Sequence, residues 1–444
     1  MNAQEVLERA REDKVRFVSL QFTDIAGTIK SVTIPIGRLE EALDRGVWFD
    51  GSSIEGFARI YESDMVLHLD PDTYQVLPWS SPERRRARII CDVHRPDGKP
   101  FAGDPRYILK RVMARARKMG YIYNTGPELE FFLFKRDQDY PTQPVPHDVG
   151  GYFDFSPRDE AQRVRSDIIL ALEAMGMEVE MGHHEVATGQ HEIDFRYADA
   201  LTSADNAMTF KYTVKAIAAT HGLYATFMPK PIFGVNGSGM HTHQSLFTLD
   251  GKNAFYDPDD PYHLSPIAYG FIAGQLVHAR ALAAVVAPTV NSYKRLVPGY
   301  EAPVYICWAQ INRSALIRIP RYSPGREQST RVELRCPDPS ANPYLAFAAM
   351  LAAGLDGIEK GMTPPEPVNE DVYLFTDEDL RQRGIKVLPG TLGEALKELD
   401  ADEVIQEALG EHIYQVFTRA KRAEWDDYRI QVTPWELDRY LETL

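Results

Sequence analysis

The chain of 444 residues has only three cysteines, and they form no CxxC pair. Cys91, Cys307 and Cys336 are far apart in the sequence, which argues against a disulfide framework and against a structural zinc site. The first residues, MNAQEVLERAREDK, are polar and contain no apolar signal core. We therefore expect a cytoplasmic protein that carries no export signal.

Long uninterrupted hydrophobic runs are also missing. The most apolar stretch, residues 267–287, contains Gln275, His278 and Arg280, so it predicts a buried helix and not a membrane span. The net charge of -15 argues against a nucleic-acid-binding surface. Neither a membrane nor a nucleic acid is an expected partner, and an anionic substrate would need a local basic cluster or metal ions.

The sequence lacks a P-loop of the form GxxxxGKS/T and a kinase glycine-rich loop, so any nucleotide site is of another type. It also lacks internal repeats and low-complexity tracts. The hydrophobic content of 44% and charged content of 25% are typical of a globular protein, and the length favours two or three domains.

The first hundred residues predict a small α+β unit. A proline- and glycine-rich segment, residues 94–104, makes a plausible boundary, which divides the chain into domains 1–100 and 101–444. Within the first domain, helices are expected at residues 4–13 and 37–45, and strands at residues 15–22, 29–34, 65–69 and 88–93.

The second domain is organised around GPELEFFLF, residues 126–134. Because a strand alternates its faces, Glu128 and Glu130 share one side of it, opposite Leu129 and Phe131. Glutamates are rarely placed beside core residues unless they are paired or bind a metal. The alternative is a strand at the edge of a sheet with two solvated acids.

Three more predicted strands carry polar side chains on one face: residues 191–196, 240–247 and 331–335. Their carboxylates, imidazoles and guanidiniums indicate one sheet whose concave face is an active site. Helices are expected at residues 104–120, 156–176 and 202–221, and two long helices, residues 266–286 and 343–360, are expected to cover the apolar side of the sheet.

Oxygen and imidazole ligands for metal ions are plentiful on these strands. A mostly carboxylate set suits Mg²⁺ or Mn²⁺, and six ligands suffice for two or more ions. The candidates are Glu128, Glu130, Glu185, Glu192, His241 and Glu333. The neighbouring pair His183–His184 is more often structural, but here Glu185 follows it directly.

Six arginines and no lysine lie within 23 residues of this acidic chain: Arg313, Arg318, Arg321, Arg326, Arg331 and Arg335. The guanidinium fork matches phosphate and carboxylate groups. The alternative is a salt-bridged surface. Metal ions beside arginines suggest phosphoryl transfer. The tract Asn236-Gly237-Ser238-Gly239 lets backbone N–H groups approach a ligand, although such tracts are more often turns.

Taken in order, these stretches resemble the glutamine synthetases of the bacterial and archaeal type I class. The resemblance runs from about Val15 to the C-terminus. The matching stretches are DGSSIEGF (50–57), GPELEFFLF (126–134), GGYFDFSP (150–157), HHEVATGQHE (183–192), NGSGMHTHQSLF (236–247), NSYKRLVPGYEAPV (291–304), NRSALIRIP (312–320) and RVELRCPDPSANPYLAFAAMLAAGLDGI (331–358).

The resemblance implies an α+β fold, with a small β-grasp-like N-terminal domain and a catalytic domain whose curved antiparallel sheet is backed by helices. It implies ATP-dependent ligation of ammonia to L-glutamate through γ-glutamyl phosphate, with two or three Mg²⁺ or Mn²⁺ ions per site. One metal site would use Glu130, Glu185 and Glu192. The other would use Glu128, His241 and Glu333.

It also implies substrate contacts. Glutamate would be held by Asn236, Gly237, Arg295, Arg313 and Arg335, with Glu301 closing over the intermediate to exclude water. ATP would contact Glu180, His243, Ser245, Arg313, Arg318 and Arg331. Ammonium would be bound by Asp50, Ser53, Tyr152 and Glu185, and the catalytic residues would be Asp50, Glu301 and Arg313.

The family assembles as two stacked hexamers, with Asp50 supplied to the neighbouring subunit's site, so a homo-dodecamer is the expected partner arrangement. The spacing from Glu185 to Glu192 and the segment 369–388 favour the non-adenylylated alpha subclass. Glutamine feedback through Arg59 is a hypothesis, and unchanged glutamine inhibition in an Arg59→Ala variant would contradict it. A regulator protein is a further candidate partner.

Two other functions compete. One is a glutamate–amine ligase of the same superfamily that uses a polyamine, although Asp50, Ser53 and Tyr152 match the ammonia-using form. The other is a non-catalytic structural or regulator-binding relative, which loss of metal ligands would mark, and none of the six is lost.

Overall fold

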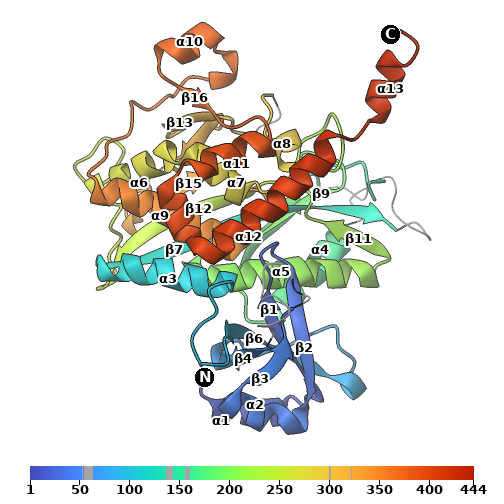
Figure 1. The fold of residues 1–444 in the computed structure, drawn as a ribbon. Helices are drawn as coiled ribbons and strands as arrows, with labels where there is room; N and C mark the ends of the chain where they lie inside the picture. Colours follow the sequence, from blue (N-terminus) through green and yellow to red (C-terminus); the bar gives the residue numbers. More distant parts are fainter. Residues whose placement is uncertain (53, 55–63, 137–143, 156–160, 300–301, 322) are drawn as a thin grey trace.

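The computed structural model describes residues 1–52, 54, 64–136, 144–155, 161–299, 302–321 and 323–444. A small N-terminal unit lies below a larger unit in the view of Figure 1. Arg59, Ser53 and Glu301 lie outside the described residues, as does residue 156, the predicted start of a helix.

The N-terminal unit is a sheet covered by two helices. Its strand order is β2-β1-β6-β4-β3, with β5 beside β6, and β1 runs parallel to β6. Its elements are α1 (Ala3–Glu12), β1 (Phe17–Thr23), β2 (Ile29–Pro35), η1 (Ile36–Arg38), α2 (Leu39–Arg45), β3 (Val47–Asp50), β4 (Asp64–Leu69), η3 (Pro71–Thr73), β5 (Gln75–Val76), η4 (Pro82–Arg84) and β6 (Arg86–His94). The predicted elements are confirmed, while the short β3 and β5 were not predicted.

The larger unit is built on a ten-stranded sheet. Its order is β16-β13-β14-β15-β12-β7-β9-β8, and β10 and β11 also pair with β7. Its strands are β7 (Tyr121–Lys135), β8 (Val179–His184), β9 (Gln190–Phe195), β10 (Ala198–Asp199), β11 (Leu223–Thr226), β12 (Met240–Thr248), β13 (Tyr305–Ala309), β14 (Ala315–Arg318), β15 (Val332–Leu334) and β16 (Lys386–Val387).

The pairs in this sheet are antiparallel except β13 with β14, which is parallel. The α+β fold and the mainly antiparallel sheet are thus as expected. The sheet is nevertheless mixed, because β13 and β14 pair in parallel.

Helices pack against the sheet and extend beyond it (Figure 1). They are α3 (Pro105–Lys118), α4 (Gln162–Ala174), α5 (Ala200–Thr220), α6 (Pro266–Val277), α7 (Ala279–Val286), α8 (Ser292–Arg295), η5 (Glu327–Ser329), α9 (Pro343–Glu359), η6 (Val372–Leu374), α10 (Asp377–Gln382), α11 (Leu392–Asp400), α12 (Glu403–Arg429) and α13 (Pro434–Tyr440). Figure 1 shows α13 reaching away from the body at the C-terminus.

Helix α9 is buried over nearly its whole length and crosses α6 closely. A Cβ on Gly274 of α6 would lie 2.1 Å from the backbone oxygen of Ala353, so glycine is required there. The expected single helix over residues 266–286 is wrong: it breaks at His278, and α6 and α7 are bent by 77°. The His278 ring lies between Asp356 and Asp402, at 3.1 and 2.6 Å, which fixes the chain at the bend.

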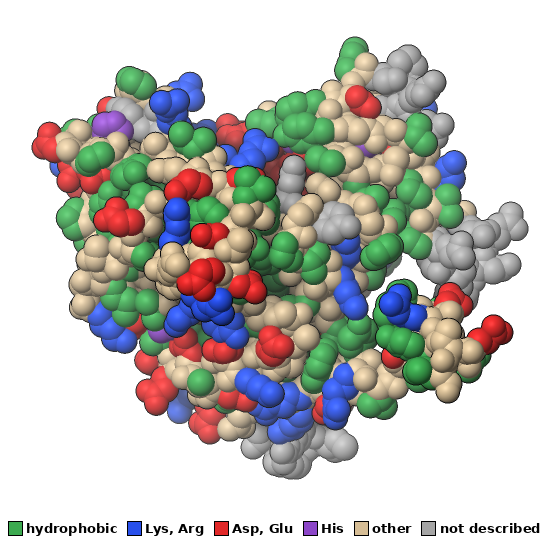
Figure 2. Space-filling view, turned by 90° about the horizontal axis from the view of Figure 1, so that it is seen from above, with side chains coloured by type: hydrophobic (Ala, Val, Ile, Leu, Met, Phe, Trp, Pro, Cys, Tyr) green, Lys and Arg blue, Asp and Glu red, His purple; other side chains and the backbone are tan. Residues whose placement is uncertain are grey.

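No single helix among the described residues is long and apolar enough to cross a membrane, although α6 and α7 taken together pass that test by length and composition. On the face shown in Figure 2, acidic and basic side chains of the described residues are interspersed.

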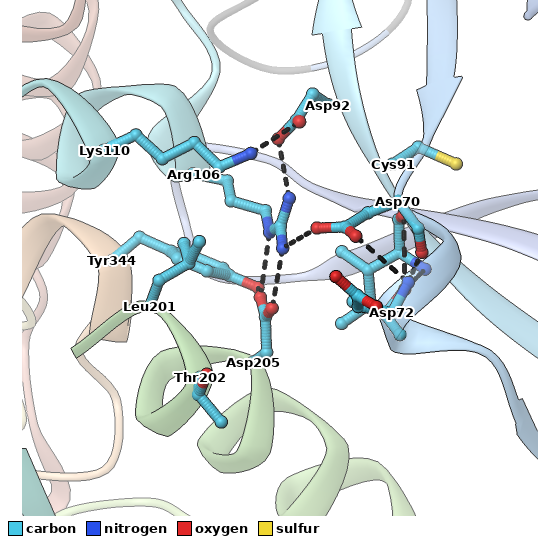
Figure 3. A network of polar contacts seen from close by, with 12 residues as sticks. Asp70, Asp72, Cys91, Asp92, Arg106, Lys110, Leu201, Thr202, Asp205 and Tyr344 are labelled. Atoms are coloured by element: carbon cyan, nitrogen blue, oxygen red, sulfur yellow. Dashed lines mark hydrogen bonds and ion pairs between the residues drawn. The ribbon is translucent and has the colours of Figure 1, made fainter. Parts of the chain in front are cut away.

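A buried arginine joins the two units (Figure 3). Arg106, at the start of α3, pairs in fork geometry with Asp205 of α5 through N–O distances of 3.0 and 2.8 Å. It also donates at 2.7 Å to Asp70 and to Asp92 of the N-terminal unit. Tyr344 donates to Asp205 from α9. One guanidinium therefore neutralises carboxylates from both units.

Replacing Arg106 with methionine should lower the free energy of unfolding by about 3–5 kcal/mol, because Asp205 and Asp70 would lose their cation and Asp92 would retain only Lys110. Urea unfolding measures this change. The matched control is Arg115→Met on the same helix, where the partially exposed pair with Glu359 should contribute only about 0–1 kcal/mol. Equal losses in the two variants would contradict the role given to Arg106.

Candidate active site

The polar face predicted for β7 is formed with its neighbours by direct cross-strand pairing. Glu128 lies opposite His241 of β12, and Glu130 lies opposite Glu192 of β9. On the far side of β12, His243 lies opposite Glu333 of β15. The structure thus brings the four predicted polar-faced strands side by side in the order β15-β12-β7-β9, and the recurrence of their polar faces had indicated one shared sheet.

Two acidic groups on this face have the geometry of metal sites. Glu128, His241 and Glu333 form one, and His183, Glu185 and Glu192 form the other, with the ligand atoms in each group within 4.8 Å of one another. His183 Nε2 lies 3.0 Å from Glu185 Oε1 and 3.3 Å from Glu192 Oε2. Carboxylate oxygens with one imidazole suit Mg²⁺ or Mn²⁺, so the donor set fits the expected ions.

Glu130, expected as a ligand with Glu185 and Glu192, is held more tightly than its neighbours. Its Oε2 accepts hydrogen bonds from Gln190 Nε2 at 2.8 Å and from the backbone N–H of Gly239 at 3.0 Å. His183 instead completes the compact group with Glu185 and Glu192. Gln190 and His183 are therefore site residues that the sequence analysis did not select, although both lie in the HHEVATGQHE stretch.

Electrostatics show that this face is short of positive charge. Burial, and after it the charge of Glu185, raises the pKa of Glu130 to about 8. Burial and the charge of Glu130 raise the pKa of Glu192 well above its usual value. Burial and the charge of Glu128 raise the pKa of Asp194 to about 7, and its buried Oδ1 has no hydrogen-bond partner among the described residues. Divalent cations would relieve this repulsion.

The two histidine rings of β12, His241 and His243, differ in their surroundings. Burial, together with the charges of Arg335 and Arg295, holds the pKa of His241 well below its usual value, so the ring is neutral and suited to bind a metal. His243 Nδ1 accepts from Arg331 Nε at 3.1 Å, so its Nε2–H donates to Glu128 Oε1 at 2.7 Å. Burial opposes ionisation of Glu128, but the hydrogen bond from His243 and the nearby Arg318 and Arg331 together lower the pKa of Glu128.

Two hollows flank the acidic groups. The larger, of about 310 Å³, contains most of the residues expected to contact ATP: Glu180, His243, Ser245 and Arg331, together with Glu128 and Asp194. The smaller, of about 40 Å³, contains most of those expected to contact glutamate: Asn236, Gly237, Arg295 and Arg335, together with Glu130, Glu185 and His241.

The arginines occupy distinct positions. Arg318 and Arg335 both pair with the buried Glu333. Arg295 donates to the backbone oxygens of Cys336 at 2.9 Å and of Arg335 at 3.2 Å, and approaches His241 at 3.4 Å, so it also fixes the chain after β15. Arg313 lies exposed next to Tyr152.

Gly239 permits the close approach of Arg295 and His241. A Cβ on Gly239 would lie 2.7 Å from Arg295 Nη2 and 2.8 Å from His241 Nε2. The glycine tract therefore provides room for side chains, and the backbone N–H of Gly239 is used by Glu130.

Asp50 and Tyr152 were expected to share the ammonium site with Glu185. Tyr152 lies near Glu185, whose charge adds to burial in raising the pKa of Tyr152. Asp50 ends β3 in the N-terminal sheet, where its carboxylate accepts from the backbone N–H of Ser52 at 2.8 Å. It lines neither hollow of the larger unit.

Replacing Glu128 or Glu130 with glutamine should weaken different Mn²⁺ sites, each by about tenfold or more, because Glu128 belongs to one acidic group and Glu130 lies opposite Glu192 of the other. Mn²⁺ titration followed by paramagnetic resonance of the free ion measures the number and affinity of the sites. Glu180→Gln, exposed on β8 and outside both groups, is the control that should titrate like the wild type. Identical curves for the two variants would contradict the separation.

Comparisons with known proteins agree with this geometry. Residues 14–96 match a family model described as "Glutamine synthetase, beta-Grasp domain", and residues 102–440 match "Glutamine synthetase, catalytic domain". Proteins named "Glutamine synthetase" are similar over nearly the full length. Those of Methanosarcina mazei and Thermus thermophilus are each 57% identical over 99% of this chain and 98% of their own, and that of Thermotoga maritima is 56% identical over 97% of each.

Among solved structures, a GmaS/ADP complex has a TM-score of 0.89 at 37% identity and covers 98% of this chain and 99% of its own. A ligand-free GmaS structure has a TM-score of 0.87 at the same identity. Matching models over both units and full-length relatives of more than 50% identity lead to one conclusion: the chain belongs to the glutamine synthetase family.

Proposed function

We propose that this chain is a glutamate–ammonia ligase, which forms L-glutamine from L-glutamate and ammonia with conversion of ATP to ADP and phosphate. Full-length similarity to proteins named "Glutamine synthetase" supports this function. The observation that carries it is that successive polar residues on one face of β7 and of β12 line two different hollows. Glu128 and His243 face the larger hollow, while Glu130 and His241 face the smaller one.

The larger hollow is the proposed ATP site. Its volume and its open, mixed lining suit a nucleotide, and ADP is present in a solved structure of the same fold. Ser245 offers a hydroxyl and Arg331 a guanidinium for phosphate oxygens, and Glu180 is an exposed residue of the lining. Arg318 does not line this hollow and pairs with Glu333, and we propose that it reaches the phosphates from there.

The smaller hollow is the proposed glutamate site. Asn236, Gly237, Arg295 and Arg335 line it together, so the α-carboxylate would meet both amide and guanidinium donors. Arg313, exposed next to Tyr152, is proposed to offset charge on the transferring phosphoryl group. Glu301 is proposed to exclude water from the intermediate.

Two or three Mg²⁺ or Mn²⁺ ions are the proposed cofactors, and when bound they neutralise phosphate and carboxylate charge between the two hollows. Glu128, His241 and Glu333 would hold one ion, and Glu130, Glu185 and Glu192 another, with His183 close to the second set. The residues themselves keep the γ-carboxylate of glutamate and the terminal phosphate of ATP facing each other, so that their reaction gives γ-glutamyl phosphate.

Once γ-glutamyl phosphate has formed and ADP is released from the transferred phosphoryl group, ammonia attacks the γ-carbonyl carbon and phosphate leaves. The nucleophile in this second step is free ammonia, because ammonium has no lone pair. Asp50, with Ser53, Tyr152 and Glu185, is proposed to bind ammonium and take up its proton. Since Asp50 lies in the N-terminal sheet and lines neither hollow, we propose that it completes the site of a neighbouring copy in a homo-dodecamer of two stacked hexamers. A cytoplasmic location, glutamine feedback at Arg59 and the non-adenylylated alpha subclass belong to the same proposal.

The test is phosphate release by purified protein with Mg²⁺, ATP and L-glutamate, started by ammonium and repeated with putrescine. We expect ammonium-dependent release matched by glutamine formation. A strong preference for putrescine would replace this function with an amine ligase, and no release with either would favour a non-catalytic relative.

Asp50→Ala should reduce glutamine formation about a hundredfold or more, because a general base is lost from the second step. Binding of ATP and of glutamate should remain close to that of the wild type, which equilibrium binding measures directly. Asp64→Ala, at the residue paired with Asp50 across β3 and β4, is the matched control and should retain activity. Equal weakening of all substrates by Asp50→Ala would instead make Asp50 structural.

A further inference from the structure

A buried cluster of one carboxylate and three imidazoles lies directly behind the acidic face. Asp148 is inaccessible to solvent at its side chain, and so is His184. His184 Nε2 lies 3.2 Å from both carboxylate oxygens of Asp148, and His147 Nε2 lies 2.7 Å from Oδ2. These hydrogen bonds and charges hold the pKa of Asp148 far below its usual value although burial opposes this.

Asp148 clamps both ends of the loop that carries Glu185. Before the loop, it contacts His184, whose Nδ1–H donates to the backbone oxygen of Glu185 at 2.6 Å. After the loop, its Oδ1 accepts from the backbone N–H of Gly189 at 2.9 Å. Gly189 has a φ of +72° and so adopts a backbone conformation that suits glycine.

The same carboxylate also fixes the chain that leads to Tyr152. The backbone N–H of Gly150 faces Asp148 Oδ1 at 3.4 Å, and the N–H of Phe153 donates to the backbone oxygen of His184 at 3.0 Å. A Cβ on Gly150 would lie 2.7 Å from His184 Nε2, so this segment packs directly on the ring.

The cluster is a support and not a further metal site. His147, Asp148 and His191 have ligand atoms within 4.8 Å of one another. However, Arg165 Nη1 lies 2.9 Å from His191 Nδ1, and a guanidinium only donates. Nδ1 therefore accepts, the proton of the neutral ring is on Nε2, and the adjacent positive charge disfavours a cation.

We propose that Asp148 is a positioning residue that, through His184 and Gly189, holds Glu185 in place as a metal ligand. Groups behind metal ligands commonly change metal affinity by about 10- to 100-fold when they are replaced. This inference rests on the part of the proposed function that makes Glu185 a ligand.

The experiment is Mn²⁺ binding to the full-length protein without substrates, followed by paramagnetic resonance of the free ion. Asp148→Asn should weaken one class of Mn²⁺ sites by about 10- to 100-fold, and that class should be the one that Glu185→Gln also weakens. The matched control is Asp356→Asn, which likewise removes a buried carboxylate from a histidine, His278, but lies on α9, outside both acidic groups. It should destabilise the protein and leave Mn²⁺ binding unchanged.

A folded Asp148→Asn variant with the wild-type number and affinity of Mn²⁺ sites would overturn the inference. If that variant does not fold, His184→Gln decides in the same way, since glutamine retains a polar group toward Asp148 but loses the donor to the Glu185 backbone. Wild-type protein that binds Mn²⁺ but forms no glutamine would overturn the proposed function and leave the role of Asp148 standing.

Discussion

Repulsion among buried carboxylates is the constraint on which the rest of this structure depends. Glu130, Glu192 and Asp194 lie close together in surroundings that disfavour their ionised forms. Such a face is stable only with compensating positive charge. Arg318 and Arg335 supply it around Glu333, and the guanidiniums of Arg318 and Arg331 supply it near Glu128. Around Glu130 and Glu192 the positive charge of the protein does not fully compensate the carboxylates. Divalent cations bound there, between two anionic substrates, would explain this arrangement.

Much of this arrangement could be predicted from the sequence because it is local. The period-two alternation of GPELEFFLF placed Glu128 and Glu130 on one face, and the helix expected over residues 104–120 corresponds to α3. The recurrence of polar-faced strands correctly indicated a shared sheet. The grouping of the ligands into two sets came from family resemblance, since spacing along the chain does not reveal which strands are neighbours.

What sequence reasoning missed depends on contacts between distant segments. His183 completes an acidic group only because β8 pairs with β9, and Gln190 reaches Glu130 only across β7. The break at His278 requires Asp356 and Asp402, which are 78 and 124 residues away. Arg106 likewise has partners 36 and 99 residues away, so its function as the link between the two units is not visible in any local pattern.

The long strand β7 also limits how the protein can evolve. It lines the larger hollow with residues 124–128 and the smaller one with Glu130, and β12 pairs with it in unbroken register from Met240 to Thr248. A change in the path of either strand therefore moves both binding sites together. Changes in the loops or in single side chains at the rims would alter one hollow and leave the spacing between the two unchanged.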